Sequence, residues 1–195
     1  MYIGNKVVRS LIRKKGGDLK EAWQAASVGQ EDFRKLKILS LGGCSTLSSL
    51  TPLSELRQLR VLNLQGCTAI SDLQPVSELK ELTQLILEGC SNVSSIDPLH
   101  NLTRLRVLML GAPADLSPLA SLQSLEQLHL HYGAEETTDL SPLASMRSLE
   151  LVCNGRGNLR LRISKELQEN PERVVSVGVR RAIQQLARER RPRKR

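Results

Sequence analysis

Leucine recurs along this chain at nearly constant intervals, and this repeat constrains the fold more than any other feature. The chain has 195 residues, of which 36 are leucine and four are aromatic, so any core must be built almost wholly from aliphatic side chains. Each repeat opens on a leucine, at successive spacings of 23, 23, 23, 20 and 24 residues: Leu36, Leu59, Leu82, Leu105, Leu125 and Leu149. One such unit cannot bury its own leucines, so we expect the units to stack and share a continuous core.

Within each repeat the apolar spacing changes from two residues to three. Leucines at relative positions 3 and 5 alternate with other residues, as in a short strand that buries one face. The leucines expected to point inward are Leu39, Leu41, Leu62, Leu64, Leu85, Leu87, Leu108, Leu110, Leu128 and Leu130. The later apolar residues stand three apart, which suits turns and short helices.

A proline occupies the same place in the second half of five repeats: Pro52, Pro75, Pro98, Pro118 and Pro142. The residues that precede these prolines are Thr51, Gln74, Asp97, Ser117 and Ser141. Proline is tolerated at the first helical position, and a preceding hydroxyl or carboxylate can accept a hydrogen bond from the exposed amides. The sequence therefore predicts a short helix or 3-10 segment in each repeat, with four of the five preceding residues as N-caps.

The pattern LxxLxLxxC, followed by spaced leucines and a PLxxLxxL return, resembles the leucine-rich repeat family over residues 36–154. The short repeats resemble those of internalins and phosphatase-regulatory subunits, and the GGCSTL, QGCTAI and EGCSNV segments resemble sensor repeats of NACHT-type and plant immune receptors. The resemblance implies an α/β solenoid, with a curved parallel sheet on the concave face, short helical or 3-10 segments on the convex face, and helical caps at both ends. It also implies a module that binds other macromolecules, usually proteins, and has no chemistry of its own. No GxxxxGK[ST] loop occurs, which excludes a P-loop ATPase.

The segments that flank the repeats fit the role of caps. We expect a helical N-terminal cap over residues 1–35, the repeats over 36–154 with five clear copies and a degenerate sixth, a C-terminal cap with a basic helix over 155–190, and a basic tail over 191–195. The first cap is predicted to hold a helix over 3–14 and a second from Asp18 to Ala26, with Trp23 available to cover the first repeat. In the C-terminal part, residues 159–164 suggest one more strand and Asn170 a helix start, although RVVSVGV is an alternative strand.

Composition points to an intracellular chain. No apolar run reaches the ~18 residues that a membrane-spanning helix needs, and the N-terminus lacks the apolar core of a secretory signal. We therefore expect a cytoplasmic location, or a nuclear one if the C-terminal basic cluster is a localisation signal. Without secretion the four cysteines are expected to be reduced. Cys44, Cys67 and Cys90 share one repeat position and are predicted to form a ladder of small buried side chains with weak S–H donors, rather than a disulfide or metal site.

The outward side chains of the strands are the candidate binding residues, because the core does not need them. The predicted partner-binding residues are Val61, Asn63, Gln84, Ile86, Glu88, Val107, Met109, Gln127, His129 and His131. Four of these, Val61, Ile86, Val107 and Met109, are expected to form a contiguous apolar patch, and exposed apolar area commonly marks a partner site. The alternative is that the protein's own tail covers the patch.

A catalytic or metal site is disfavoured. His129 and His131 share the concave face, and the repeat register predicts Cys153 beside His129, which would allow a nucleophile–base pair or a metal ligand set. No third group orients the imidazole in any way that the sequence reveals. We therefore expect no enzyme activity, no cofactor, no metal and no small-molecule substrate.

The termini carry most of the positive charge. Residues 1–17 have five basic and no acidic side chains, residues 173–195 have nine basic and one acidic, and the body between them is mildly acidic. The basic residues of the last segment are Arg180, Arg181, Arg188, Arg190, Arg191, Arg193, Lys194 and Arg195, together with Arg173. Clustered arginine can neutralise phosphates, so the alternative function is a nucleic-acid-associated factor whose tail contacts RNA or DNA while the repeats recruit a protein. Without interleaved aromatic residues the tail favours non-specific binding to nucleic acid or an acidic protein.

Overall fold

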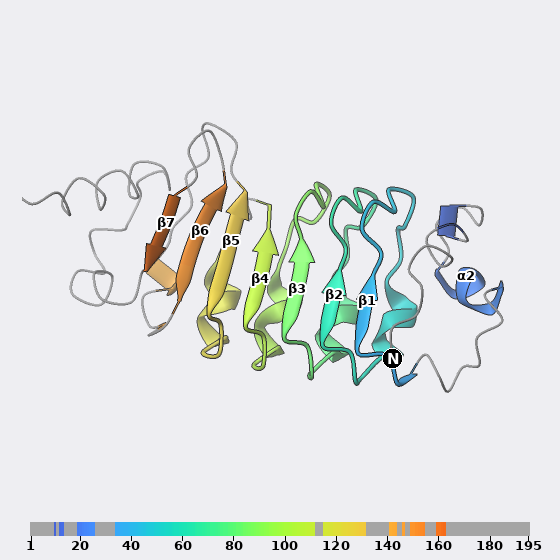
Figure 1. The fold of residues 1–195 in the computed structure, drawn as a ribbon, viewed down its shortest axis with the longest axis horizontal. Coiled ribbons are helices and arrows are strands. Elements are labelled where there is room, and N and C mark those ends of the chain that lie inside the picture. Colours follow the sequence, from blue (N-terminus) through green and yellow to red (C-terminus); the bar gives the residue numbers. More distant parts are fainter. Residues whose placement is uncertain are drawn as a thin grey trace, which may run out of the picture.

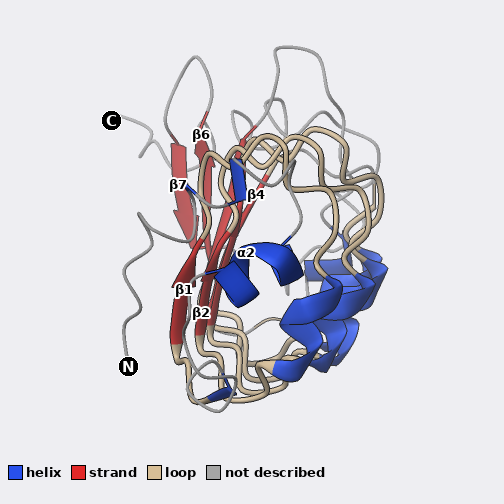
Figure 2. Ribbon diagram, turned by 90° about the vertical axis from the view of Figure 1, so that its right-hand side faces the viewer, coloured by secondary structure: helices blue, strands red, loops and turns tan. Residues whose placement is uncertain are grey.

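The computed structural model describes residues 10, 12–13, 19–25, 34–111, 115–131, 141–143, 146, 149–154 and 159–162. Within this part of the chain, seven strands form one sheet in sequence order, and five short 3-10 helices lie on the opposite side (Figures 1 and 2). The strands are β1 Ile38–Ser40, β2 Val61–Asn63, β3 Gln84–Leu87, β4 Val107–Leu110, β5 Gln127–His131, β6 Glu150–Asn154 and β7 Leu159–Arg162. The helices are α2 Leu19–Ala25, η1 Thr51–Glu55, η2 Gln74–Glu78, η3 Asp97–Asn101, η4 Ser117–Ser121 and η5 Ser141–Leu143.

The ten leucines expected to point inward, which we call the leucine spine, have the predicted arrangement. Neighbouring strands from β1 to β6 are parallel, and Leu39, Leu62 and Leu85 pair in register with one another. All ten leucines expected to point inward are at most 4% exposed. Successive side chains of a strand point to opposite faces of the sheet, so every second residue lies in the core and the others lie on the outer face. The α/β solenoid with a parallel sheet and 3-10 segments is therefore confirmed.

The capping of the 3-10 helices differs from the prediction. Thr51, Gln74, Asp97 and Ser117 are the first residues of their helices, and no side-chain cap bond comes from the residue before them. The acceptor lies two residues earlier: the backbone N–H of Gln74 donates to Asp72 at 2.7 Å, and that of Ser117 donates to Asp115 at 2.7 Å. In the same way, the hydroxyl oxygens of Ser49 and Ser95 accept hydrogen bonds from the backbone N–H groups of Thr51 and Asp97. The short polar side chain thus closes a turn ahead of the helix.

The predicted cysteine ladder is present at the end of each of the first three strands. The thiol of Cys67 donates to the carbonyl of Leu41 at 3.2 Å, and that of Cys90 donates to the carbonyl of Leu64 at 3.1 Å. Cys44, Cys67 and Cys90 are all buried. Burial raises the pKa of the Cys90 thiol, against a smaller opposing effect of a backbone hydrogen bond from Cys67. The thiols of Cys67 and Cys90 therefore each tie one repeat to the preceding one, and burial disfavours the thiolate of Cys90.

Helical residues pack against the first repeat. Ile12, Leu19 and Ala22 are buried and belong to the same apolar core as the leucine spine. Figure 2 shows α2 between the sheet and the 3-10 layer at the N-terminal end of the solenoid. Helix α2 matches the segment predicted from residue 18 to 26, and residues 10, 12 and 13 are helical within the helix predicted over 3–14. The Trp23 side chain lies outside the described part.

At the other end the sheet closes differently from a wholly parallel solenoid. The strand predicted in residues 159–164 is present as β7, but it pairs antiparallel with β6. A hairpin therefore ends the sheet, since an antiparallel pair needs only a short connection. The predicted helix from residue 170 and the basic tail lie outside the described residues. No helix in the described part of the chain is long and apolar enough to cross a membrane.

Candidate functional site on the concave face

The outward residues of the strands form two rows across the sheet. The lower row, near the strand starts, consists of Ile38, Val61, Gln84, Val107, Gln127 and Glu150. The upper row consists of Ser40, Asn63, Ile86, Met109, His129 and Val152. Parallel pairing places neighbours in a row ~4.8 Å apart, so side chains of adjacent repeats are in reach of one another. All ten predicted partner-binding residues lie in these rows or directly beyond the upper one.

The predicted apolar patch is present in the centre of this face but is not fully continuous. Ile86 pairs with Met109, and Val107 lies on the same strand and face as Met109. All three side chains are half-buried. Gln84 separates Val107 from Val61 in the lower row. We call the three residues Ile86, Val107 and Met109 the central patch.

A second apolar pair lies at the N-terminal end of the face. Ile38 pairs with Val61, and Ile38 is 40% exposed, more than any other large hydrophobic residue in the described part. Ile38 is an outward residue of the repeat, but the set of partner-binding residues predicted from the sequence omits it. The sequence feature that identifies Ile38 as a candidate is its place at relative position 2 of the first repeat, which is equivalent to that of Val61.

A polar cluster borders the central patch beyond the upper row. The Gln65 amide donates to one carboxylate oxygen of Glu88 at 3.1 Å, and His131 Nδ1 lies 3.4 Å from the other. Glu88 and His131 are two repeats apart, and Gly111 stands between them without a side chain, so the carboxylate and imidazole can meet. The sequence places both at relative position 6 but does not reveal that they span a repeat.

The predicted neighbour of His129 is wrong. Val152 pairs with His129, whereas Cys153 pairs with Leu130. The last repeat spacing is one residue longer, yet Leu151 keeps step with Leu128 and is completely buried. A one-residue shift exchanges the two faces of a strand, so Leu151 takes the inward place and Glu150 the outward one. The register therefore does not place Cys153 directly beside His129, as the catalytic alternative requires.

The remaining predicted residues do not assemble a reactive centre within the described part. Gln127 donates to Glu150 at 3.5 Å in the lower row, and Asn63 accepts from the backbone N–H of Gln65 at 2.9 Å. No group of three His, Cys, Asp or Glu among the described residues is placed to hold a metal ion. The tail residues predicted to contact nucleic acid or an acidic partner lie outside the described residues. What this face offers is apolar and hydrogen-bonding surface.

A stacked parallel sheet whose inner face carries apolar and polar side chains defines a repeat scaffold for binding other molecules. The model of the leucine-rich repeat region family matches residues 19–187, most of the chain. The chain belongs to the leucine-rich repeat family, whose members are generally binding scaffolds rather than catalysts.

Solved structures of similar fold come from bacteria. An internalin (inlF) of Listeria monocytogenes is 31% identical with a TM-score of 0.58, over 75% of this chain and 41% of that one. Internalin C2 of the same species is 20% identical with a TM-score of 0.37, over 78% and 87% of the two chains. A leucine-rich repeat protein of Leptospira interrogans is 18% identical with a TM-score of 0.46, over 60% and 31%. No curated protein is significantly similar. The chain thus spans less than half the length of the first of these internalins.

Proposed function

We propose that this chain is a non-catalytic protein-interaction module that docks a protein partner on its concave face. The leucine-rich repeat fold supports a role in protein–protein interaction in general, and the central patch supports the location. Ile86, Val107 and Met109 face outward, are only half-buried and are not needed to close the core. A partner that removes apolar side chains of this kind from water lowers the free energy of the complex.

The polar residues around the central patch suit the rim of such an interface. Protein interfaces commonly have an apolar centre surrounded by hydrogen-bonding groups that stay near water. Gln84, Gln127 and the Gln65–Glu88–His131 cluster supply such groups at the lower and upper borders. The proposal further takes the chain to be the recognition part of a larger regulatory or immune-type system in the cytoplasm, where the buried thiols stay reduced.

The test is a pair of matched variants of the full chain. Val107→Glu with Met109→Glu places two charges in the central patch, while Asn101→Glu with Thr103→Glu adds the same charge on exposed residues near η3. Burying an unpaired charge at an interface costs about 2–5 kcal/mol, so capture of the partner should fall at least about tenfold in the first variant only. Quantitative mass spectrometry of captured proteins measures the loss, and circular dichroism checks that both variants stay folded.

Photo-cross-linking locates the contact independently. A photoreactive residue in place of Gln84 should cross-link to the same captured protein, whereas one in place of Thr103 should not. Capture that is unchanged by the patch variant, together with cross-links from Thr103 alone, would place the binding site away from the concave face.

A further inference from the structure

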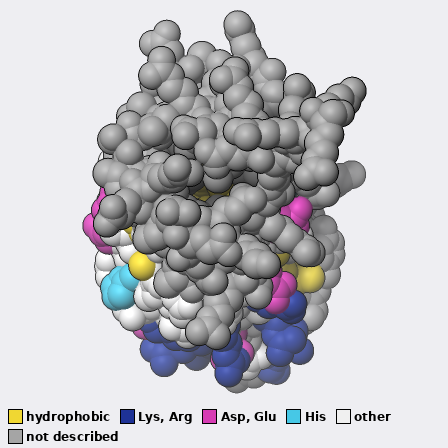
Figure 3. Space-filling model, turned by 90° about the vertical axis from the view of Figure 1, so that its left-hand side faces the viewer, with side chains coloured by type: hydrophobic (Ala, Val, Ile, Leu, Met, Phe, Trp, Pro, Cys, Tyr) yellow, Lys and Arg dark blue, Asp and Glu magenta, His cyan; other side chains and the backbone are white. Residues whose placement is uncertain are grey.

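The edge of the sheet at which β1–β3 begin carries basic side chains that the proposed concave site does not use. Figure 3, which faces the end of the molecule that carries β7, shows Lys and Arg gathered at the bottom, the level at which β1–β6 start in Figure 1. At the other end of this edge, beside the leucines that open the first three repeats, the basic residues are Arg34, Lys35, Lys37, Arg57, Arg60 and Lys80, all of them exposed. Three of them, Arg34, Arg57 and Lys80, stand two residues before the leucine that opens a repeat. Lys37 and Arg60 stand one residue after such a leucine, and Lys35 directly precedes Leu36.

Backbone hydrogen bonds hold these positions side by side. The N–H of Arg60 donates to the carbonyl of Lys37 at 2.8 Å, and the N–H of Thr83 donates to the carbonyl of Arg60 at 2.8 Å. Lys37 and Arg60 therefore stand on adjacent repeats at the ~4.8 Å strand spacing. Like charges this close repel one another, so the arrangement favours an anionic partner that lies across several repeats.

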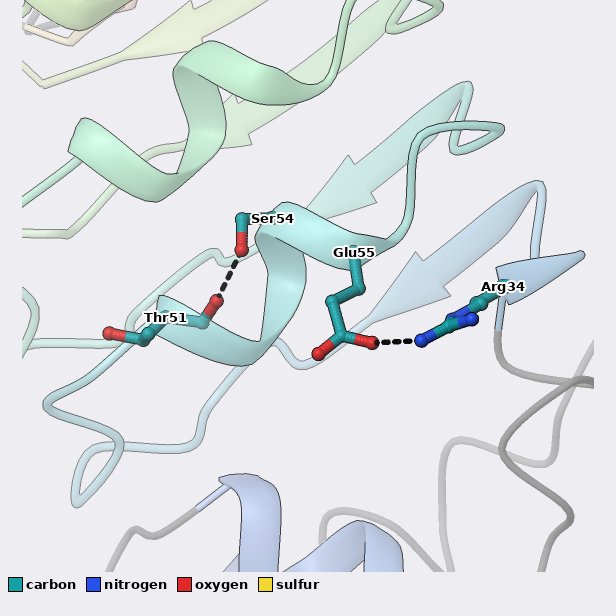
Figure 4. Close-up of polar contacts among 4 residues, drawn as sticks. All are labelled: Arg34, Thr51, Ser54 and Glu55. Carbon is teal, nitrogen blue, oxygen red and sulfur yellow. Dashed lines mark hydrogen bonds and ion pairs between the residues drawn. The ribbon is translucent and has the colours of Figure 1, made fainter.

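Acidic residues neutralise this edge unevenly. Arg34 is paired with Glu55 at 3.1 Å (Figure 4), and in later repeats Arg104 is paired with Glu81 and Arg106 with Glu126. Within the described residues no ion pair is found for the other basic side chains of the first three repeats: Lys35, Lys37, Arg57, Arg60 and Lys80. We call these five residues the basic edge.

The basic edge adjoins the apolar end of the concave face. Lys37 directly precedes Ile38, and Arg60 directly precedes Val61, so each of these two cations stands next to an outward apolar side chain. A ligand that covers Ile38 and Val61 brings its own edge against Lys37 and Arg60. The matching ligand is apolar where it meets the lower row and acidic where it meets the edge.

A protein segment fits this edge better than a nucleic acid does. Residues 34–111 and 115–131 contain no Phe, Tyr or Trp, the side chains on which the bases of single strands most often stack. Carboxylates, among them Glu55 and Glu81, are interspersed with the cations and would repel a continuous phosphate backbone. An acidic protein segment instead carries discrete charges and apolar side chains beside them.

We propose that the basic edge binds an acidic segment of the protein partner, whose neighbouring apolar residues rest on Ile38 and Val61. This inference rests on the proposed function in one respect, that the partner is a protein. It assigns the partner's chemistry and orientation: its acidic margin faces the start of β1–β3, and the remainder extends over the concave face toward the central patch.

The test compares changes of equal net charge in the full chain. The edge variant is Lys37→Glu with Arg60→Glu, which lowers the net charge by four. The matched control adds four negative charges at exposed neutral residues in the turns after the strands, through Ser45→Glu, Thr46→Glu, Thr68→Glu and Ser91→Glu. The probes are a fluorescein-labelled peptide of repeating Glu-Glu-Leu and a labelled oligothymidylate of the same length, measured by fluorescence anisotropy at low and physiological salt. Circular dichroism establishes that both variants fold.

We expect the edge variant to bind the acidic peptide about tenfold or more weakly, and the control variant to stay within about threefold of the parent. Equal weakening by both variants, absence of peptide binding, or tighter binding of oligothymidylate that depends on Lys37 and Arg60 would overturn the inference. The central-patch variant separates the two proposals: if it keeps the captured protein and the edge variant loses peptide binding, the concave site is wrong and the edge stands.

Discussion

At the scale of single residues, the turn that follows each of the first three strands depends on one glycine. Gly43, Gly66 and Gly89 have φ angles of 78°, 69° and 74°, a region that side chains with a Cβ avoid. Each precedes a cysteine of the buried ladder, and the left-handed residue turns the chain inward. After Gly66 and Gly89 this turn brings the thiols of Cys67 and Cys90 to a carbonyl of the previous repeat. The glycine and the thiol act together to join repeats.

We predict that Gly66→Ala lowers the free energy of unfolding by about 1–2 kcal/mol, because alanine must adopt the left-handed conformation. Gly111→Ala is the matched control: a Cβ there meets no atom within 4 Å, and its φ is not in that region. The control should change stability by less than about 0.5 kcal/mol. Chemical denaturation measures both, and equal losses would mean that the backbone conformation is not the cause.

At the scale of elements, each of the 3-10 helices η1 to η4 is preceded by a short polar side chain that accepts a hydrogen bond from its first residue, two positions later. Asp115 shows the electrostatic part of this arrangement, since hydrogen bonds from the Ser117 hydroxyl and backbone N–H lower the pKa of Asp115 from its ordinary value. The folded state therefore binds the proton less readily than the unfolded chain. The carboxylate stabilises the fold above the ordinary Asp pKa, and this contribution is lost as the pH falls through the lowered value.

The Asp115→Asn variant isolates the charge, because asparagine keeps an acceptor oxygen. Its stability should fall furthest below that of the parent near pH 7. The difference should shrink as the pH drops below about 4, where Asp115 of the unfolded parent begins to bind a proton, and it should disappear below the lowered pKa of the folded parent. Asp115→Ala should be destabilised across the whole range, because the acceptor is gone. Thermal unfolding at a series of pH values provides the measurement, and a difference that does not change with pH would contradict the role of the charge.

Some features of these elements can be predicted from the sequence and others cannot. Strand positions and inward leucines follow from spacing alone, because burial fixes which side of a strand faces the core. The 3-10 segments follow from proline, but their capping residues do not, since hydroxyl and carboxylate groups occur both one and three residues before the proline. The repeat pattern counted from Leu149 predicts that Val152 faces the core. Leu151, one residue earlier, fills that place instead, so the predicted register of the sixth strand is wrong. Contacts such as Glu88 with His131 depend on side-chain reach across a repeat, which no local pattern encodes.

At the scale of the whole molecule, stability is shared between neighbours along one axis. The core is a continuous stack of leucines that extends from the helical residues near the N-terminus to the sixth strand. Each repeat pairs with the one before and the one after it, and the binding surface is the sum of one or two outward residues from each. Both the concave site and the basic edge therefore depend on the register that the stack maintains.

In this linear architecture, the position of a core substitution should determine which strands lose stability. Leu85 and Leu39 are equivalent core leucines, at 0% and 2% exposure, in the third and first repeats. Either change to alanine should cost about 2–5 kcal/mol of local packing. Leu85→Ala removes contacts shared with both neighbours, so hydrogen exchange should accelerate in β2, β3 and β4, while Leu39→Ala should affect β1 and β2. Mass spectrometry of peptides from each strand resolves the two patterns. If both variants accelerated exchange equally from β1 to β5, the repeats would unfold as one all-or-none unit, and the nearest-neighbour description of this solenoid would be wrong.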